Sequence, residues 1–208
     1  MGYFPFYIDI KNKNALIVGA GKVAFHKIKK LIPYETRLHI IAERIDKDVY
    51  ELAEHNGNVT YEQRKFKDDD IEGNTFVVAA TSDESLNAHI YRLCSNKGIL
   101  VNVVDVKDKC DFIFPSVVHQ GNLSIGISSS GTSPYMTRII ADKIKEIIPD
   151  NIEAILDFLS DVRIMAKEKI SDSHCRAEFL SEIAAWCYEN NTTADTDMIE
   201  KIINKFNK

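Results

Sequence analysis

A glycine-rich turn near the N-terminus joins two different hydrophobic patterns. Residues 15–18 are continuously apolar, as in a strand buried on both faces, whereas residues 22–32 repeat apolar side chains at helical spacing. Between them the sequence reads Gly19-x-Gly21-x-x-Ala24. In dinucleotide-binding folds the first glycine permits a tight turn, the second lets the backbone approach a pyrophosphate, and the small third residue lets the helix pack near the strand. The same pattern also fits an ordinary tight turn, so its context has to decide.

Short apolar segments alternate with amphipathic ones as far as about residue 105, which predicts a doubly wound parallel α/β sheet of the Rossmann kind. The charged segment 67–71 is predicted to be a solvent-facing turn or the start of a short helix. The predicted strands are 15–18, 37–42, 60–65, 75–80 and 100–104, and the predicted helices are 22–32, 46–54 and 85–97.

Polar residues at the ends of these strands favour a dinucleotide. Glu43 follows the second strand about 20 residues after the glycine turn, where such folds place an acid for the ribose hydroxyls. Arg44 could instead hold a 2′-phosphate, but Glu43 would repel one, so NAD is favoured over NADP. Both side chains also fit solvated loop charges. The predicted cofactor contacts are Gly19, Gly21, Lys22, Val23, Glu43, Arg44 and Thr81.

The chain changes character after residue 105. Residues 112–118 and 123–128 are predicted to pair as antiparallel strands through a turn at 119–122. A helix is expected from Pro134 to about residue 148, with Ser133 as its N-cap, and helical periodicity continues over 151–206. The predicted domains are a dinucleotide-binding domain at 1–112, a small antiparallel segment at 113–148 and a C-terminal helical domain at 149–208.

Composition narrows the possible functions. The 208 residues carry a net charge of −5, which argues against a general nucleic-acid binder. Four scattered cysteines form no Cys-x-x-Cys pair, so no metal site is predicted. No signal peptide or membrane-spanning segment is recognised, and a cytoplasmic protein is expected. The apolar N-terminal residues Tyr3, Phe4 and Phe6 could line a cofactor site, but packing in the core or at a dimer interface is favoured.

Three blocks together resemble the precorrin-2 dehydrogenase module of siroheme synthesis, which also forms the N-terminal part of siroheme synthases. The blocks are 16–24, Asn102-Val-Val-Asp105 and Phe112-Ile-Phe-Pro-Ser-Val-Val followed by Ile127-Ser-Ser-Ser-Gly-Thr-Ser-Pro134. The resemblance implies NAD-dependent oxidation of precorrin-2 to sirohydrochlorin in porphyrin biosynthesis. It also implies a homodimer formed through the segment after the Rossmann domain, with no nucleic-acid or membrane partner.

The resemblance directs attention to a carboxylate, a histidine and a hydroxyl-rich loop. Asp105 is the first candidate for taking a proton as hydride leaves, although it also fits a turn or N-cap aspartate. His119 suits a proton shuttle or an iron contact, although a turn histidine is more often simply exposed. A loop opening a helix can bind substrate carboxylates, although capping explains part of it. The predicted substrate contacts are Ser124, Ser128, Ser130, Thr132, Ser133 and Arg138.

Two other functions compete with a simple dehydrogenase. Some members of the resembling family also insert ferrous iron, so a bifunctional dehydrogenase and ferrochelatase, a lyase, is one alternative. A non-catalytic NAD-binding regulatory module is the other. A module of that kind needs no proton acceptor at the sheet edge, so Asp105 and the serine-rich loop favour an enzyme.

Overall fold

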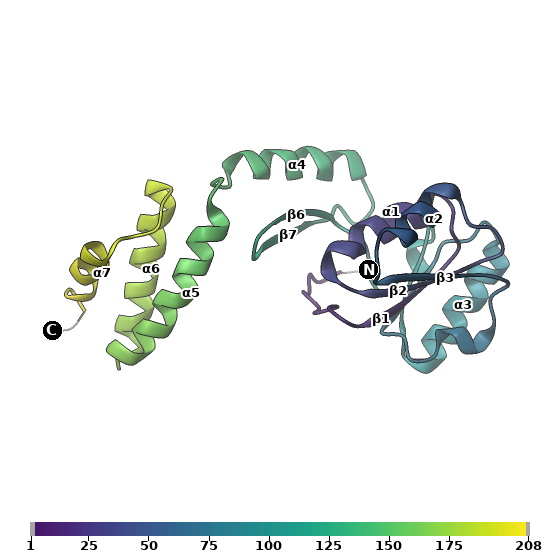
Figure 1. Cartoon of the computed structure of the whole chain (residues 1–208), viewed down its shortest axis with the longest axis horizontal. Helices are drawn as coiled ribbons and strands as arrows, with labels where there is room; N and C mark the ends of the chain where they lie inside the picture. Colours follow the sequence, from purple (N-terminus) through teal and green to yellow (C-terminus); the bar gives the residue numbers. More distant parts are fainter. Residues whose placement is uncertain (1–2, 207–208) are drawn as a thin grey trace. The chain divides into compact units, whose positions relative to one another are not determined.

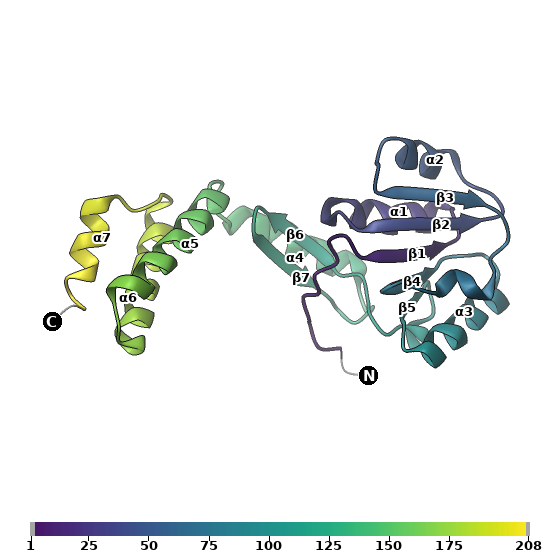
Figure 2. The ribbon, with the colours of Figure 1, turned by 60° about the horizontal axis from the view of Figure 1, so that its bottom comes forward.

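Five parallel strands form the sheet of the first part of the chain, in the order β3-β2-β1-β4-β5 (Figure 2). The computed structural model describes residues 3–206, and the chain divides into two units, one ending at Phe114 and one starting at Pro115. The predicted parallel α/β sheet is confirmed. Its strands are β1 (Asn14–Val18), β2 (Arg37–Ala42), β3 (Val59–Gln63), β4 (Phe76–Ala79) and β5 (Leu100–Val103).

Helices cover both faces of this sheet, as Figure 1 shows. On one face, α1 (Lys22–Leu31) and α2 (Lys47–Glu54) bury apolar residues such as Ile28 and Val49. On the other face, α3 (Glu84–Lys97) buries Ile90 and Cys94. Because both faces are covered, β4 is apolar throughout and β1 is apolar at every position after Asn14, which is the pattern that predicted them. Three short 3₁₀ helices complete the unit at Ile32–Tyr34, Asp68–Ile71 and Lys107–Lys109.

The charged segment at 67–71 contains the short 3₁₀ helix Asp68–Ile71, and its expected exposure to solvent holds for its first three residues but not for Asp70 and Ile71. The Asp70 carboxylate is only 12% exposed and receives two hydrogen bonds from the Arg64 guanidinium, at 2.7 and 2.8 Å. Burial by itself would raise the pKa of Asp70, but the hydrogen bonds from Arg64 lower it overall. Ile71 is fully buried beneath this pair. The segment therefore closes one end of the core around an ion pair.

An antiparallel hairpin opens the second unit, and its position differs from the prediction. Its strands are β6 (Ser116–Gln120) and β7 (Leu123–Ile127), and α4 (Pro134–Ile147) packs on one face of the hairpin. The turn is only Gly121 and Asn122, so His119 lies within β6 and not in the turn. Gly121 has a φ of +54°, which a two-residue hairpin turn needs and glycine supplies. Phe112 and Phe114 precede the strand and pack against the core of the first unit.

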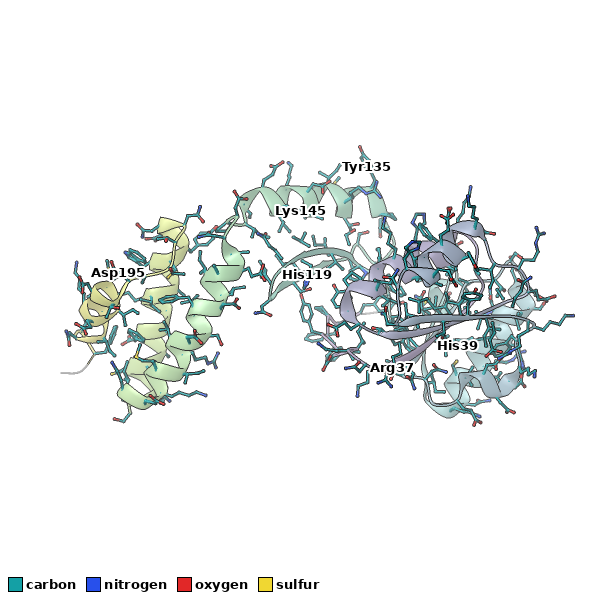
Figure 3. All side chains as sticks on the ribbon, viewed as in Figure 1. Arg37, His39, His119, Tyr135, Lys145 and Asp195 are labelled. Atoms are coloured by element: carbon teal, nitrogen blue, oxygen red, sulfur yellow. The ribbon has the colours of Figure 1, made fainter. Side chains whose placement is uncertain are left out.

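Three helices after α4 share a separate core, as the helical periodicity predicts. They are α5 (Ile152–Lys169), α6 (Ser173–Asn190) and α7 (Thr196–Ile203), and Ile155, Phe179 and Ile183 are buried between them. Asp195, labelled in Figure 3, caps α7 by accepting a hydrogen bond from the Met198 amide. The division of this unit into a dimerisation segment and a helical domain stays a prediction.

The N-terminal segment is not part of the core. Phe4 and Phe6 are 74% and 77% exposed, so the expected packing of these rings in the core of the chain is wrong. Tyr3 lies closer to the first unit, where its hydroxyl is 3.4 Å from the carbonyl oxygens of Lys107 and Cys110. A dimer contact for this segment stays a prediction.

Candidate functional site

The turn after β1 requires glycine at its first position. Gly19 has a φ of +107°, a conformation that residues with a side chain rarely adopt. A Cβ atom on Gly19 would lie 2.3 Å from the carbonyl oxygen of Ala80, the residue after β4. On the other side, the Gly19 amide donates to the carbonyl oxygen of Ile41 in β2 at 2.8 Å. The turn is therefore held against the ends of both strands that flank β1.

The N-terminus of α1 presents amide groups suited to an anion. Gly21 is the N-cap residue and supplies no side-chain cap, and the first turn contains no acidic residue. The amides of this turn have no partner within the helix, and the helix dipole makes this end positive. Lys22 and Val23 are exposed here. The nearest atom to a Cβ built on Gly21 is Asp46 Oδ2, at 3.9 Å, so space is available above this glycine.

The ends of the strands place the turn at the switch point of the sheet. β1 pairs with β2 on one side and with β4 on the other, and Val18 is level with both Ile41 and Ala79. Open α/β sheets bind their ligands outside the carboxyl ends of the strands at this point. The structure brings the predicted residues Gly19, Gly21, Glu43, Thr81 and Asp105 to this edge.

Two acids lie near the glycine turn on its β2 side. Glu43 and Arg44 occupy the bend directly after β2, and both are exposed. Asp46, which was not among the predicted site residues, precedes α2 as its N-cap residue, and its amide donates to the carbonyl oxygen of Ala20 at 3.1 Å. Its role as an N-cap was the available signal. The two carboxylates can accept hydrogen bonds from ribose hydroxyls at this part of the sheet edge.

Thr81 is held in place by a buried asparagine. The Thr81 hydroxyl lies 2.7 Å from Asn87 Oδ1, and Asn87 Nδ2 donates to the Thr81 carbonyl oxygen at 3.0 Å. Asn87 is 6% exposed and belongs to α3. Asn87 was not among the predicted site residues, although a polar residue on the buried side of a helix was a usable signal. The hydrogen bonds between Thr81 and Asn87 therefore fix the conformation of the loop after β4, beside Gly19.

Asp105 is the exposed tip of the turn that follows β5. The Val106 amide donates to the Val103 carbonyl oxygen at 3.3 Å, and Asp105 between them has a φ of +61°. Aspartate is among the few residues other than glycine that adopt this left-handed conformation readily. The carboxylate therefore projects from the sheet edge on a tight turn, which suits a group that reacts with a ligand and equally suits an aspartate chosen for the turn.

Asn102 and Cys110 form a partly buried polar pair, here called the clamp, that holds the Asp105 turn in place. The Cys110 thiol lies 3.1 Å from the Val103 carbonyl oxygen and 3.3 Å from that of Val106, the two ends of the turn. Burial raises the pKa of this thiol, so it stays protonated at neutral pH and can donate. Asn102, 6% exposed, donates to Cys110 Sγ at 3.4 Å and to the Phe112 carbonyl oxygen at 2.9 Å. An asparagine inside an apolar strand was the signal for this clamp.

In the second unit, His119 and Ser124 lie directly opposite each other on β6 and β7. Opposed residues in an antiparallel pair share one face of the sheet. Val118 is buried on the face that packs against α4, so His119 and Ser124 lie on the other face. Figure 3 shows His119 on the side of the hairpin away from α4. The hairpin therefore presents an imidazole and a hydroxyl together.

The serine-rich loop before α4 uses several of its hydroxyl groups internally. Ser128 Oγ accepts from the Ser130 amide at 3.0 Å, and Ser129 Oγ accepts from the Ser133 amide at 2.9 Å. Ser133 caps α4 by accepting from the Met136 amide at 3.2 Å, as predicted. A hydroxyl that accepts in this way keeps its own hydrogen to donate. Ser128, Ser130, Thr132 and Arg138 are all exposed.

Residues 6–116, more than half of the chain, match the model of a family described as putative NAD(P)-binding. The chain belongs to this NAD(P)-binding family. Within residues 3–206 no group of three or more His, Cys, Asp or Glu side chains is arranged to hold a metal ion, and no helix there is long and apolar enough to cross a membrane.

Curated relatives of this NAD(P)-binding protein include siroheme synthases. That of Buchnera aphidicola subsp. Acyrthosiphon pisum is 33% identical over 183 residues, covering 88% of this chain and 38% of the relative. That of Ruthia magnifica subsp. Calyptogena magnifica is 36% identical over 179 residues, covering 86% of this chain and 38% of the relative. The resemblance found in the sequence is thus confirmed, and the chain spans less than two fifths of the length of these relatives.

A solved structure supports the fold of the whole chain. The structure described as "SirC, precorrin-2 dehydrogenase" superposes with a TM-score of 0.72, covers 98% of both chains and is 21% identical. At this identity the likeness shows the fold.

The clamp in this NAD(P)-binding domain is expected to contribute to the stability of the fold. Replacing Asn102 with alanine is expected to lower the free energy of unfolding by about 1–3 kcal/mol, because the Phe112 carbonyl oxygen loses its buried donor. Urea denaturation measures the change. Asn122→Ala is the control, since the side chain of this exposed hairpin residue donates to the exposed Asp157 carboxylate. Equal losses for the two variants would contradict the clamp.

Proposed function

We propose that the chain is an NAD-dependent dehydrogenase that oxidises precorrin-2 to sirohydrochlorin in siroheme synthesis. The observation that carries this proposal is the Asp105 carboxylate on a clamped turn at the same sheet edge as the glycine turn. The names of the relatives and of the superposed structure support the same substrate. A regulatory module would need only the glycine turn.

The cofactor proposed is NAD. Its pyrophosphate would lie over Gly19 and Gly21 at the N-terminus of α1, where the first helix amides have no partner within the helix and Gly21 supplies no side-chain cap. Glu43 would accept hydrogen bonds from ribose hydroxyls. Together with Asp46 it would repel a 2′-phosphate, which favours NAD over NADP. Bound NAD would supply the hydride acceptor of the reaction.

The protein's own groups would then handle protons and carboxylates. Oxidation removes a hydride and a proton from the macrocycle, and Asp105 is proposed to accept the proton. His119 is proposed as a proton shuttle. The hydroxyls of Ser124, Ser128, Ser130, Thr132 and Ser133, with the Arg138 guanidinium, are proposed to bind the carboxylates of the substrate.

An anaerobic assay with precorrin-2 and NAD tests the function. Formation of sirohydrochlorin together with equimolar NADH is expected. The absorbance of each product measures its formation. Absence of both, with NAD binding intact, would reject the dehydrogenase and favour a binding module. Adding ferrous iron to the reaction tests the bifunctional alternative, which predicts that sirohydrochlorin is converted to siroheme.

We also propose that the protein is a homodimer formed through α4. Among its residues Tyr135, Met136 and Ile147 are 72%, 50% and 68% exposed, which is unusual for apolar side chains on one helix. Figure 3 shows Tyr135 on the side of α4 away from the hairpin. Light scattering should give twice the chain mass of 23.6 kDa.

A charge on α4 should separate the two copies. Ile147→Asp is expected to shift the protein towards the single-chain mass, because a carboxylate would be buried in an apolar contact. The matched control is Ile164→Asp on α5, where the side chain is 60% exposed. A monomeric wild type, or dissociation by the control alone, would contradict an interface at α4.

A further inference from the structure

Lys27 is a half-buried lysine close to the Asp105 turn that the proposed function leaves without a role. It lies in the second turn of α1, and its ammonium nitrogen is 4.2 Å from the centre of the Phe114 ring. A ring beneath an ammonium attracts it and limits where it can move. Phe114 is itself packed against Phe112 in the first core, with ring centres 5.6 Å apart. The lysine head is therefore held on a rigid support.

The position of Lys27 on its helix directs it towards the ligand edge of the sheet. Side chains on a helix lean towards its N-terminus, and the N-terminus of α1 lies at the glycine turn. The electrostatic environment of Lys27 supports this direction, because Asp105 and Cys110 are among the groups that act on its ammonium. Lys27 therefore lies near the turn that follows β5 and carries Asp105.

Within residues 3–206, Lys27 forms no ion pair with a carboxylate. Burial lowers its pKa, and Lys30 nearby lowers it further, while Cys110 and Asp105 act in the opposite direction. A partly buried ammonium without an ion-pair partner is costly, and proteins usually pair such groups. A ligand carboxylate at this place would supply the missing partner.

We propose that the Lys27 ammonium, held on the Phe114 ring beside Asp105, binds a carboxylate of the tetrapyrrole substrate. The inference rests on the proposed function and deepens it by naming a residue that selects an acidic substrate. The ion pair would hold the macrocycle next to the group proposed to accept its proton. The nicotinamide end of the cofactor offers no carboxylate, and its pyrophosphate is assigned to the helix N-terminus, so the substrate is the partner that fits.

The test compares Lys27→Met with Lys27→Arg and with Lys29→Met, an exposed lysine on the same helix. At saturating NAD, Lys27→Met should raise KM for precorrin-2 roughly tenfold, the size expected for losing one charged hydrogen bond. Lys27→Arg should stay within about threefold of wild type because it keeps the charge, and Lys29→Met should match wild type. The Kd of NAD should be unchanged in all three.

A binding measurement separates this inference from catalysis. Dehydrogenation leaves the carboxylates in place, so fluorescence titration with sirohydrochlorin should show the same roughly tenfold loss for Lys27→Met. Lys27→Gln serves the same purpose if Lys27→Met does not fold. Wild-type turnover with unchanged KM and Kd in the variant overturns the inference alone. Absence of wild-type turnover overturns the proposed function, and the inference with it.

Discussion

Replacing Gly19 with alanine is expected to lower the free energy of unfolding by about 4 kcal/mol or more, among the largest effects of a single substitution. The added methyl carbon would lie 2.3 Å from the carbonyl oxygen of Ala80, and the φ of +107° is unfavourable for alanine. Neither β1 nor β4 can move away, because both lie in the middle of the sheet. Urea denaturation of the purified variant measures the loss.

Gly21→Ala is the matched control and should separate stability from binding. A methyl group there meets no atom closer than 3.9 Å, so stability should change by only about 1 kcal/mol, the usual cost of alanine at an N-cap. The Kd for NAD should nevertheless rise at least roughly tenfold, because the methyl group occupies the space where a pyrophosphate would approach. Equal destabilisation of both variants, or full NAD affinity in Gly21→Ala, would contradict this account of the turn.

Asp105→Asn is expected to reduce precorrin-2 turnover by about 10²- to 10⁴-fold, the usual contribution of a general base. Asparagine has the same shape and also adopts the left-handed conformation, so the turn with its φ of +61° should persist. Single-turnover absorbance under anaerobic conditions measures the rate. Alanine would be a poorer choice, because it adds backbone strain at this position to the loss of the carboxylate.

Two controls accompany the Asp105 variant. Asp108→Asn removes an exposed carboxylate three residues further on and should leave turnover unchanged. The Kd for NAD should stay within about twofold of wild type in both variants, since a twofold change is only a few tenths of a kcal/mol. If Asp105→Asn keeps more than about a third of wild-type turnover, a general base of this strength is excluded and Asp105 serves the turn only.

Local patterns predicted the first unit well and the start of the second one poorly. For example, β2 spans Arg37–Ala42, the range predicted from its apolar residues. The strand predicted over 112–118 starts too early, because β6 begins only at Ser116. The structure instead anchors residues 112–115 to the first core, through the Asn102 side chain and contact between the Phe76 and Phe112 rings. Asn102 and Phe76 are distant in sequence, so no local pattern reports them.

In the β6–β7 hairpin, local patterns also failed to predict the exact length of the turn. Polar residues around Gly121 predicted a four-residue turn at 119–122, whereas the observed turn has two residues, Gly121 and Asn122. The observed two-residue turn pairs His119 with Ser124, which places both on one face. Turn length decides register, and register decides which side chains share a face.

The sequence by itself determined the parallel sheet, the glycine turn after its first strand and the acids that follow later strands. These follow from hydrophobic period and glycine spacing, which act over a few residues. Only the tertiary structure decided that Asn102 and Cys110 clamp the Asp105 turn and that Lys27 lies over Phe114 beside it. Such contacts depend on strand order and on where the chain returns after β5, and they form because burial of distant apolar groups brings those residues together.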